Sequence, residues 1–384
     1  MRMLVLGAGL QGCAAAFDLL RSPDVASVTL ADRREPSLPP FLAAARDSRF
    51  RTLLLDVNDQ AAVQAAMSDH DAVLSALPYY FNGPMAALAV ASGAHFCDLG
   101  GNTEIVLEQQ KLDAAAAAKG VSIMPDCGLA PGMVNILAAE GYRRLDETKE
   151  VRIYVGGLPQ QPEPPLNYQI VYSLEGALDY YTTQSWIVRD GRSVQVDALS
   201  ELEEVDFDAP VGTLEAFHTA GGLSTMAFSY ANRLDVMEYK TLRYPGHVAV
   251  MKPIRELGLI SNTPIDVKGQ SVVPRDLFIA AVQPKLFKPK GHDLVALRVV
   301  ARGVQGGKPA EARFDLVDRY DAVHGVSAMM RCTGYSLSIT AQMQAGRRVH
   351  RMGVTTPDEG MPFRGYADAL RARGVIIHEA GVGA

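Results

Sequence analysis

Three glycines near the amino terminus have the spacing of a loop that binds the diphosphate of a dinucleotide. Gly7, Gly9 and Gly12 form the pattern G-x-G-x-x-G. In that pattern the first glycine makes a tight turn, the second lets the backbone approach the diphosphate, and the third lets the next helix pack closely. Asp32 follows Gly12 by twenty residues, where a carboxylate can bind the ribose hydroxyls of NAD. Asp32 would repel a 2′-phosphate, whereas Arg33 and Arg34 would attract one. Because Asp32 occupies the strand end itself, we predict NAD and keep NADP as the alternative.

This loop needs a strand before it and a helix after it. Residues 3–6 form a short apolar run, and residues 13–20 are rich in alanine and leucine, which favour a helix. The amino end of that helix would present unpaired N–H groups and a positive dipole end to an anion. A second apolar run, residues 28–31, ends directly before Asp32. This order of elements predicts a nucleotide site, and the alternative is a structural turn.

The first third of the chain alternates between strand-like and helix-like stretches. We expect strands at 51–56, 72–78, 95–100 and 121–126, and helices at 60–68, 84–92 and 103–119. This alternation is typical of an α/β domain with a doubly wound parallel sheet, a Rossmann domain, which binds ligands beyond the carboxyl ends of its strands. The cofactor-binding residues that we predict at this edge are Gly7, Gly9, Leu10, Gln11, Gly12, Asp32, Arg33, Asp56, Val57, Ala76, Leu77, Pro78 and Asp98.

From about residue 134 the pattern becomes rich in β-structure. The sequence predicts strands at residues 151–159 and 294–303, and a further strand at 312–320 that lies opposite the strand at 294–303. Residues 185–197 predict a hairpin with a turn at Asp190-Gly191. These stretches predict a second, α+β domain with a mostly antiparallel sheet.

The change of pattern predicts three parts of the chain. A dinucleotide-binding Rossmann domain would take residues 1–132, and a substrate-binding and dimerisation domain would take 133–334. The segment 335–384 begins with helical periodicity and ends in a strand-like run, GVIIHEA. We expect this segment to return to the Rossmann domain.

Composition narrows the class of protein. The chain has 384 residues, 48% hydrophobic residues and a net charge of -6, which suits a globular protein and disfavours a nucleic-acid surface. No apolar run is long enough to span a bilayer and no signal peptide precedes the first strand, so we expect a cytoplasmic protein without membrane contact. The four cysteines lack C-x-x-C spacing, so we expect no metal site.

Polar side chains gather in three stretches of the second domain. These are LEAFHTAGGLST (214–225), EYKTLRYPGH (238–247) and MMRCTGYS (329–336). Each mixes Arg, His, Thr, Tyr and Gly in a region otherwise suited to packing. Loops with such groups on a rigid scaffold are frequent binding sites, and ordinary turn chemistry is the alternative.

Several motifs, taken in order, resemble those of the saccharopine dehydrogenase family, and most of all its L-lysine 6-dehydrogenase branch. The motifs are GAGLQG, LADRR, ALPYYFNG, DLGG, PDCGLAPGM, YVGGLP, SLEG, EAFHTAGG and YKTLRYPGH. The resemblance implies NAD-dependent oxidative deamination of L-lysine at the ε-carbon, giving ammonia and a 6-semialdehyde that cyclises. It also implies a Rossmann domain with an inserted α/β domain that often forms the subunit contact, so we expect a homodimer or a larger homo-oligomer.

The implied reaction needs a base, because a lysine ammonium must lose a proton before hydride can leave the ε-carbon. Asp98, at a strand end, and His218, with its ordinary pKa near neutrality, are both candidates. We place Arg243 and His247 with them as catalytic residues.

The substrate carboxylate calls for a planar two-pronged donor, which Arg243 or Arg331 would supply. Glu175 is a candidate for the α-ammonium. Tyr79 and Thr225 complete the predicted substrate-binding residues.

Two other functions remain open. One is a saccharopine dehydrogenase or reductase that acts on a lysine-derived or polyamine-derived secondary amine. The other is a non-catalytic NAD-binding protein.

Overall fold

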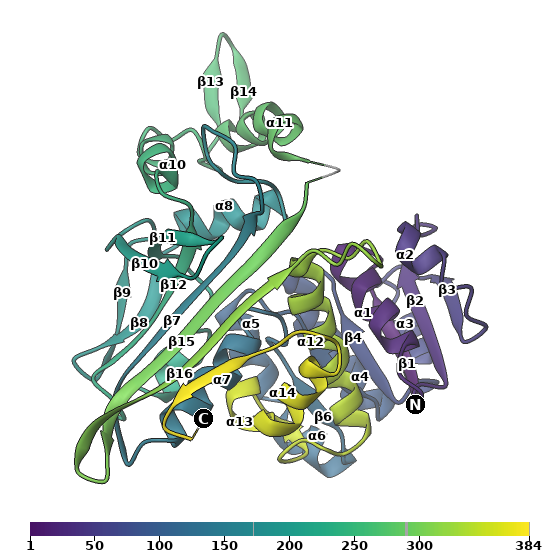
Figure 1. Ribbon diagram of the computed structural model, residues 1–384. Helices are drawn as coiled ribbons and strands as arrows, with labels where there is room; N and C mark the ends of the chain where they lie inside the picture. The colour runs from purple at the N-terminus through teal and green to yellow at the C-terminus, as the bar shows by residue number, and fades with distance from the viewer. Residues whose placement is uncertain (172, 289–290, 384) are drawn as a thin grey trace.

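The computed structural model describes residues 1–171, 173–288 and 291–383. Figure 1 shows two sheets side by side, a parallel sheet built largely from the amino-terminal third and a long twisted sheet built from the middle of the chain. This arrangement confirms the predicted fold class, a Rossmann-type α/β domain joined to a second domain with a mostly antiparallel sheet.

The parallel sheet has seven strands in the order β17-β6-β5-β4-β1-β2-β3. Their bounds are β1 (Arg2–Leu6), β2 (Ser27–Asp32), β3 (Phe50–Leu54), β4 (Ala72–Ser75), β5 (His95–Asp98), β6 (Ser122–Met124) and β17 (Gly353–Val354). Successive side chains of a strand point to opposite faces, so Met3 and Val5 pack in one core cluster while Leu4 and Leu6 pack in another. Both faces are therefore buried, which explains the continuous apolar strands.

Helices cover both faces of this sheet. On the Met3 face lie α1 (Leu10–Leu20) and α12 (Ala328–Ala345), and on the Leu4 face lie α3 (Gln60–Ser68) and α4 (Asn82–Ser92). The shorter elements are α2 (Pro40–Ala43), η1 (Tyr79–Phe81), α5 (Thr103–Gln110), α6 (Asp113–Lys119), α13 (Pro357–Gly360) and α14 (Phe363–Arg371). The single helix expected at 103–119 is thus two helices, α5 and α6.

The second sheet follows the order β10-β11-β12-β7-β15-β16-β18, with β8 and β9 attached to β12. Its strands are β7 (Glu147–Pro159), β8 (Ser185–Arg189), β9 (Arg192–Val196), β10 (Glu203–Phe207), β11 (Gly212–His218), β12 (Val236–Arg243), β15 (Asp293–Gln305), β16 (Lys308–Arg319) and β18 (His378–Gly381). Among its described pairings, β12 with β7 is parallel and the others are antiparallel. The predicted hairpin is present, and Asp190 and Gly191 have the positive φ angles that its tight turn requires.

Helices and a small hairpin complete the second domain. They are α7 (Met133–Arg143), α8 (Leu174–Thr182), α9 (Met226–Ser229), α10 (His247–Glu256), α11 (Pro274–Leu286), β13 (Ile265–Val267) and β14 (Gln270–Val272). The β13–β14 hairpin and α11 project from the top of the molecule in Figure 1.

The end of the chain contacts both sheets. Helix α12 packs on α1, and Gln344 Nε2 donates to the carbonyl oxygens of Phe96 and Ser122 in the parallel sheet. The return to the Rossmann domain therefore begins at Ala328, earlier than residue 335. The last strand differs from the expectation, because β18 pairs with β16 of the second sheet.

Candidate functional site

A pocket of about 250 Å³ lies at the carboxyl edge of the parallel sheet, beside the glycine loop. Its lining includes nine of the residues predicted to contact the cofactor: Gly7, Gly9, Asp32, Arg33, Asp56, Val57, Ala76, Leu77 and Pro78. Leu10, Gln11 and Gly12 lie beside it in the first turn of α1. The predicted cofactor residues, with the exception of Asp98, are therefore gathered around one cavity.

The three glycines differ in what a side chain would meet. A Cβ atom at Gly12 would lie 1.9 Å from the carbonyl oxygen of Gly7, and one at Gly7, where φ is +95°, would lie 2.8 Å from the carbonyl oxygen of Ala76. A Cβ at Gly9 would meet no atom within 4 Å. Gly7 and Gly12 are thus needed for the fold of the loop, whereas Gly9 leaves open space of the kind that a diphosphate needs.

Asp32 supports the loop from the end of β2. Its Oδ2 accepts a hydrogen bond of 2.9 Å from the amide of Ala8, and its Oδ1 accepts one of 3.2 Å from the amide of Arg34. At the next strand end, hydrogen bonds from Asn58 lower the pKa of Asp56. Open space at Gly9, an anionic strand end and a helix amino terminus together fit a dinucleotide.

A second cavity of about 340 Å³ lies between the Rossmann domain and the second domain. We call it the interdomain cleft. Residues that follow β4 and β5 form one wall, and residues of α8, β8, β9 and the loop after β11 form the other. The lining comprises Tyr79, Gly101, Asn102, Thr103, Glu104, Gly176, Asp179, Tyr180, Thr183, Gln184, Trp186, Gln195, Ala220, Gly221, Leu223 and Ser224. These described lining residues include two carboxylates, Glu104 and Asp179, and no Arg, Lys or His. Arg275 of α11 pairs with Asp179, so Glu104 contributes most of the negative charge that could attract a cationic group.

A buried carboxylate lies directly behind this cleft. Asp126, which follows β6, is 2% exposed and accepts a hydrogen bond from the Ser224 hydroxyl of the second domain. Burial raises the pKa of Asp126 to about 7, and the nearby charge of Asp98 adds to that rise. Asn135, in the first turn of α7, donates to the carbonyl oxygens of Gly222 and Leu223. The loop that carries Ser224 is therefore fixed at two points, to Asp126 on the Rossmann side and to Asn135 of the second domain.

Asp98 ends β5 and is fully buried. It accepts hydrogen bonds of 2.7 Å from the Gly100 amide and from Gln109 Nε2, and one of 3.3 Å from the Asp126 amide. Burial raises the pKa of Asp98 to about 6, against the effect of these donors. Asp98 lines neither the nucleotide pocket nor the cleft. Its contacts hold the loops after β5 and β6 together, and its predicted roles as base and cofactor ligand stay predictions.

His218, the other candidate base, is fully buried at the end of β11. Its Nδ1 lies 3.3 Å from the carbonyl oxygen of Tyr239, and its Nε2 lies 3.2 Å from Oε2 of Glu201. Burial, with the nearby charge of Lys240, lowers the pKa of His218. His218 is absent from the described lining of the cleft.

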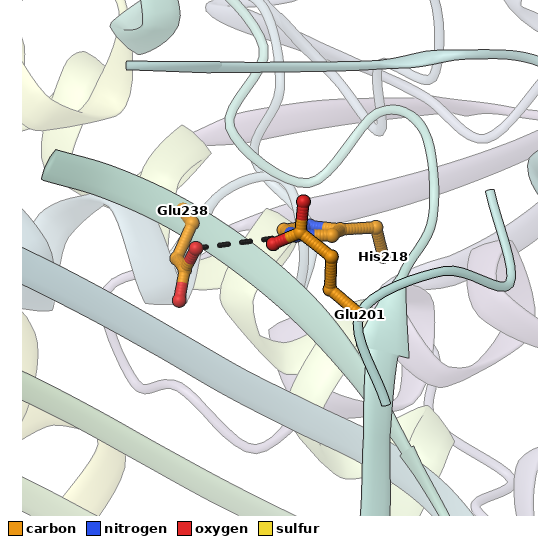
Figure 2. Close-up of side chains that lie close together, drawn as sticks. All are labelled: Glu201, His218 and Glu238. Atoms are coloured by element: carbon orange, nitrogen blue, oxygen red, sulfur yellow. Dashed lines mark hydrogen bonds and ion pairs between the residues drawn. The ribbon is translucent and has the colours of Figure 1, made fainter. Parts of the chain in front are cut away.

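Figure 2 shows that Glu201, His218 and Glu238 point toward one another. The ligand atoms that they offer lie within 4.8 Å of one another, as at a metal site. However, Arg189 pairs with Glu201 at 2.7 Å, and Arg152 pairs with Glu238. The two arginines neutralise the two carboxylates, so the cluster is better described as an ion-pair network.

Arg243 and His247 lie inside the second domain and outside the described lining of the cleft. The Arg243 guanidinium stacks over the Tyr168 ring at 4.8 Å, and its Nη1 donates to the carbonyl oxygen of Leu242. His247 Nε2 lies 3.0 Å from the Tyr181 hydroxyl. Burial, with the Arg243 charge, lowers the pKa of His247 to about 3, so it is neutral near pH 7. Their predicted catalytic roles are not tested by these contacts.

The predicted substrate ligands are dispersed. Tyr79 lines the cleft, and Thr225 lies buried next to the cleft residue Ser224. Glu175 is exposed in the first turn of α8, where a carboxylate stabilises the helix dipole. Arg331 pairs with Asp318 through two hydrogen bonds of 2.8 and 3.2 Å. Of the four predicted ligands, the structure therefore places Tyr79 in the cleft and Thr225 beside it, and it gives Arg331 a partner within the fold.

Sequence reasoning expected a strand at 121–126 and selected Asp98, but it did not select Asp126. It also did not select Ser224 or Tyr180, which line the cleft. The signal for Asp126 was its position directly after an apolar strand. No local signal marks the pairing of Asp126 with Ser224, because these residues are 98 positions apart.

Within the described residues, no helix combines the length and hydropathy needed to cross a bilayer.

Comparison with protein families gives two matches that together span most of the chain. The saccharopine dehydrogenase NADP binding domain matches residues 3–124, and the saccharopine dehydrogenase C-terminal domain matches residues 128–375. The first match shows an NAD(P)-binding domain and does not distinguish NAD from NADP.

Curated relatives include fungal saccharopine dehydrogenases described as NADP(+)-dependent and L-glutamate-forming. The Schizosaccharomyces pombe protein is 23% identical over 315 residues, which cover 78% of this chain and 62% of the relative. The Pyricularia oryzae protein is 27% identical over 277 residues, covering 68% of this chain and 58% of the relative. The chain thus matches about three fifths of the length of these relatives.

Two solved structures share the fold over nearly the whole chain. One is apo saccharopine dehydrogenase (L-Glu forming) from Saccharomyces cerevisiae, with a TM-score of 0.79, 19% identity and coverage of 100% of both chains. The other is homospermidine synthase from Legionella pneumophila in complex with NAD, with a TM-score of 0.67, 11% identity and coverage of 99% of this chain and 91% of that one.

Proposed function

Because the chain belongs to the saccharopine dehydrogenase family, we propose that it oxidises a C–N bond of an amino acid bound in the interdomain cleft, with NAD(P) as the oxidant. One observation carries this proposal. Pro78, Tyr80 and Phe81 line the nucleotide pocket, while Tyr79, in the same turn, lines the cleft. The cofactor site and a cavity for a small substrate therefore lie on two sides of a single turn.

The first candidate substrate is a secondary amine of the saccharopine type, because several relatives carry that name. Loss of hydride from the carbon next to nitrogen leaves an imine, and water then splits the imine into an aldehyde and a primary amine. The bound cofactor supplies the hydride acceptor. The protein's own residues must bind the amine, orient it and take up a proton.

The charge of the cleft favours a second candidate, L-lysine itself. Glu104 lines the cleft together with Asp179, which Arg275 partly neutralises, and the described lining has no basic side chain. That lining would attract the ε-ammonium of lysine but would not neutralise the additional carboxylates of a saccharopine-type substrate. Oxidation at the ε-carbon would then release ammonia and a 6-semialdehyde, as the resemblance to lysine 6-dehydrogenase implies.

For the cofactor we propose NAD before NADP. Asp32 and Arg33 both line the nucleotide pocket, and the carboxylate at the strand end is the group that binds ribose hydroxyls and repels a 2′-phosphate.

A cofactor-reduction assay with a panel of amines tests the proposed function. The panel contains saccharopine, L-lysine, L-ornithine and a polyamine, each tested with NAD and with NADP. Reduction with saccharopine alone supports the first candidate, and reduction with lysine alone supports the second. If calorimetry detects cofactor binding but no amine reduces the cofactor, the protein is a non-catalytic nucleotide-binding protein and the proposal is wrong.

We further propose that the protein forms a homodimer or a larger homo-oligomer through its second domain. Light scattering of the purified protein measures this directly.

A further inference from the structure

Asp126 and Ser224 form a hydrogen bond between the two domains, and both have unusual backbone conformations. The φ angle of Asp126 is +63° and that of Ser224 is +49°. The left-handed region costs an ordinary residue about 1–2 kcal/mol, although aspartate tolerates it better than most residues. Such strain often marks a functional position. The two strained residues therefore indicate that this contact has a role besides joining the domains.

The pair connects a buried carboxylate to the cleft. Ser224 lines the cleft and donates its hydroxyl proton to Oδ2 of Asp126. A serine hydroxyl has one proton to donate and two lone pairs that accept. While it donates to Asp126, Ser224 can therefore still accept a hydrogen bond from a donor in the cleft.

The ionisable groups that interact with Asp126 do not compensate the negative charge of its carboxylate. Its Oδ1 lies against the backbone of Gly100, and the Gly101 amide approaches the carboxylate without forming a well-aligned hydrogen bond to Oδ1. The ionisable groups that interact with Asp126 are Asp98, Asp358, Tyr180 and Cys127. All four are neutral or negative, so a proton on Asp126 relieves repulsion as well as the cost of burial. With a pKa of about 7, the carboxylate is able to take up and release a proton near neutral pH.

We propose that Asp126 is the proton acceptor for an amine bound in the cleft, and that the Ser224 hydroxyl relays the proton. This inference rests on the proposed function. An N–H bond of the substrate ammonium breaks as Ser224 Oγ takes the proton, while the O–H bond of Ser224 breaks as Asp126 Oδ2 takes that proton. No electrons are exchanged with the cofactor in this step. The amine becomes neutral, and its lone pair then assists departure of hydride from the adjacent carbon.

Asp98 is less suited to this task. Its two oxygens accept from three donors inside the fold, and no cleft-lining hydroxyl contacts it. Asp126 has an oxygen without a well-formed hydrogen bond and a partner on the cleft wall.

Two variants and a matched control test the relay. Asp126→Asn keeps the size of the side chain and removes the base, and Ser224→Ala removes the relay. Ser338→Ala is the control, because Ser338 of α12 donates at 2.6 Å to another buried carboxylate, Asp18 of α1, and neither residue is among the described lining residues of the cleft. Circular dichroism and calorimetric cofactor affinity show whether each variant is folded.

The readout is the pH profile of kcat/KM with the amine that proves active. For the wild type and Ser338→Ala we expect an acidic limb with a pKa of about 7. At pH 7, Asp126→Asn should lose about 100-fold and Ser224→Ala about 10-fold, with partial recovery in alkaline solution, where solvent takes the proton. A folded Asp126→Asn variant that keeps the acidic limb would overturn the proposal.

A second measurement does not depend on turnover. Infrared difference spectra of the protein with bound NAD(P) are recorded as the pH is raised from 5 to 8. A protonated carboxyl band that disappears with a midpoint near pH 7 should be present in the wild type and in Ser338→Ala and be absent in Asp126→Asn. Absence of that band in the wild type would refute Asp126 as the proton acceptor. If the band appears but no amine reduces NAD(P), the proposed function fails while the proton acceptor stands.

Discussion

The nucleotide pocket and the interdomain cleft are built in opposite ways. The pocket is formed by short stretches at the ends of neighbouring strands, and backbone geometry at Gly7 and Gly12 decides its shape. The cleft depends on side chains from two domains, held together by contacts such as Asp126–Ser224. A local motif can therefore specify the cofactor site, whereas the substrate site exists only in the assembled molecule.

Removal of Arg331 tests whether this residue belongs to the substrate site or to the framework. Arg331→Met should lower the free energy of unfolding by about 3–5 kcal/mol, because it leaves the buried Asp318 without its partner. Substrate KM should change little in protein that remains folded. The control, Arg364→Met, removes an exposed ion pair with Glu379 and should cost less than about 1 kcal/mol. A large rise in the substrate KM of Arg331→Met, without a loss of stability, would show that Arg331 binds the substrate.

The pH dependence of stability tests the charge balance behind the cleft. The folded protein holds the Asp126 proton up to a pKa of about 7, while the ordinary value is 3.8. The stability associated with this proton is complete below the ordinary pKa and is lost as the pH rises to about 7. Urea titrations should therefore show that Asp126→Asn flattens the decline of stability between pH 4 and 7, by at most about 4 kcal/mol. An unchanged slope would mean that Asp126 titrates normally.

The third glycine of the loop tests how strictly backbone contact shapes the pocket. Gly12→Ala places a Cβ 1.9 Å from the Gly7 carbonyl oxygen, so it should cost about 1–3 kcal/mol of stability. Gly83→Ala is a matched control in α4, where a Cβ meets nothing within 4 Å. Thermal unfolding separates the two variants. Equal melting temperatures for Gly12→Ala and the wild type would contradict the steric account.

The second glycine separates binding from folding. Gly9→Ala should leave the melting temperature unchanged, since its Cβ meets no protein atom within 4 Å. Calorimetry should nevertheless show cofactor affinity reduced by about tenfold or more, or about 1.4 kcal/mol, because the methyl group occupies space needed by the diphosphate. Unchanged affinity would show that the cofactor does not approach this part of the loop.

The smallest effect concerns the choice between NAD and NADP. Asp32→Ser should shift the ratio of affinities toward NADP by about tenfold, because it removes repulsion of the 2′-phosphate while Arg33 remains. Arg33→Ala should shift the ratio the other way. If neither variant changes the ratio, the adenosine ribose does not bind at this end of the pocket.

The same contrast explains how much could be predicted from the sequence. The G-x-G-x-x-G spacing, the apolar strands and the Asp190-Gly191 turn express local rules. The structure contains each of these elements where it was predicted, although β3, β4, β5 and β6 end two to three residues before the expected position. The register of β18 on β16 and the break between α5 and α6 depend on contacts that no short window contains.

Site residues of the second domain were harder to predict for the same reason. Arg331, His218 and His247 have the right chemistry, but burial and partners distant in sequence determine what they contact. Asp126 was overlooked because its environment depends on Ser224, which comes from the other domain.

The central claim is that hydride passes from a carbon next to nitrogen, held in the cleft, to a dinucleotide held by the glycine loop. The most direct test uses saccharopine and L-lysine deuterated at the ε-carbon, with NAD(P) present, followed by mass spectrometry of the recovered cofactor. The account predicts that the reduced nicotinamide carries the deuterium with one of the two substrates. Reduced cofactor without deuterium, or none formed with either substrate, would contradict it.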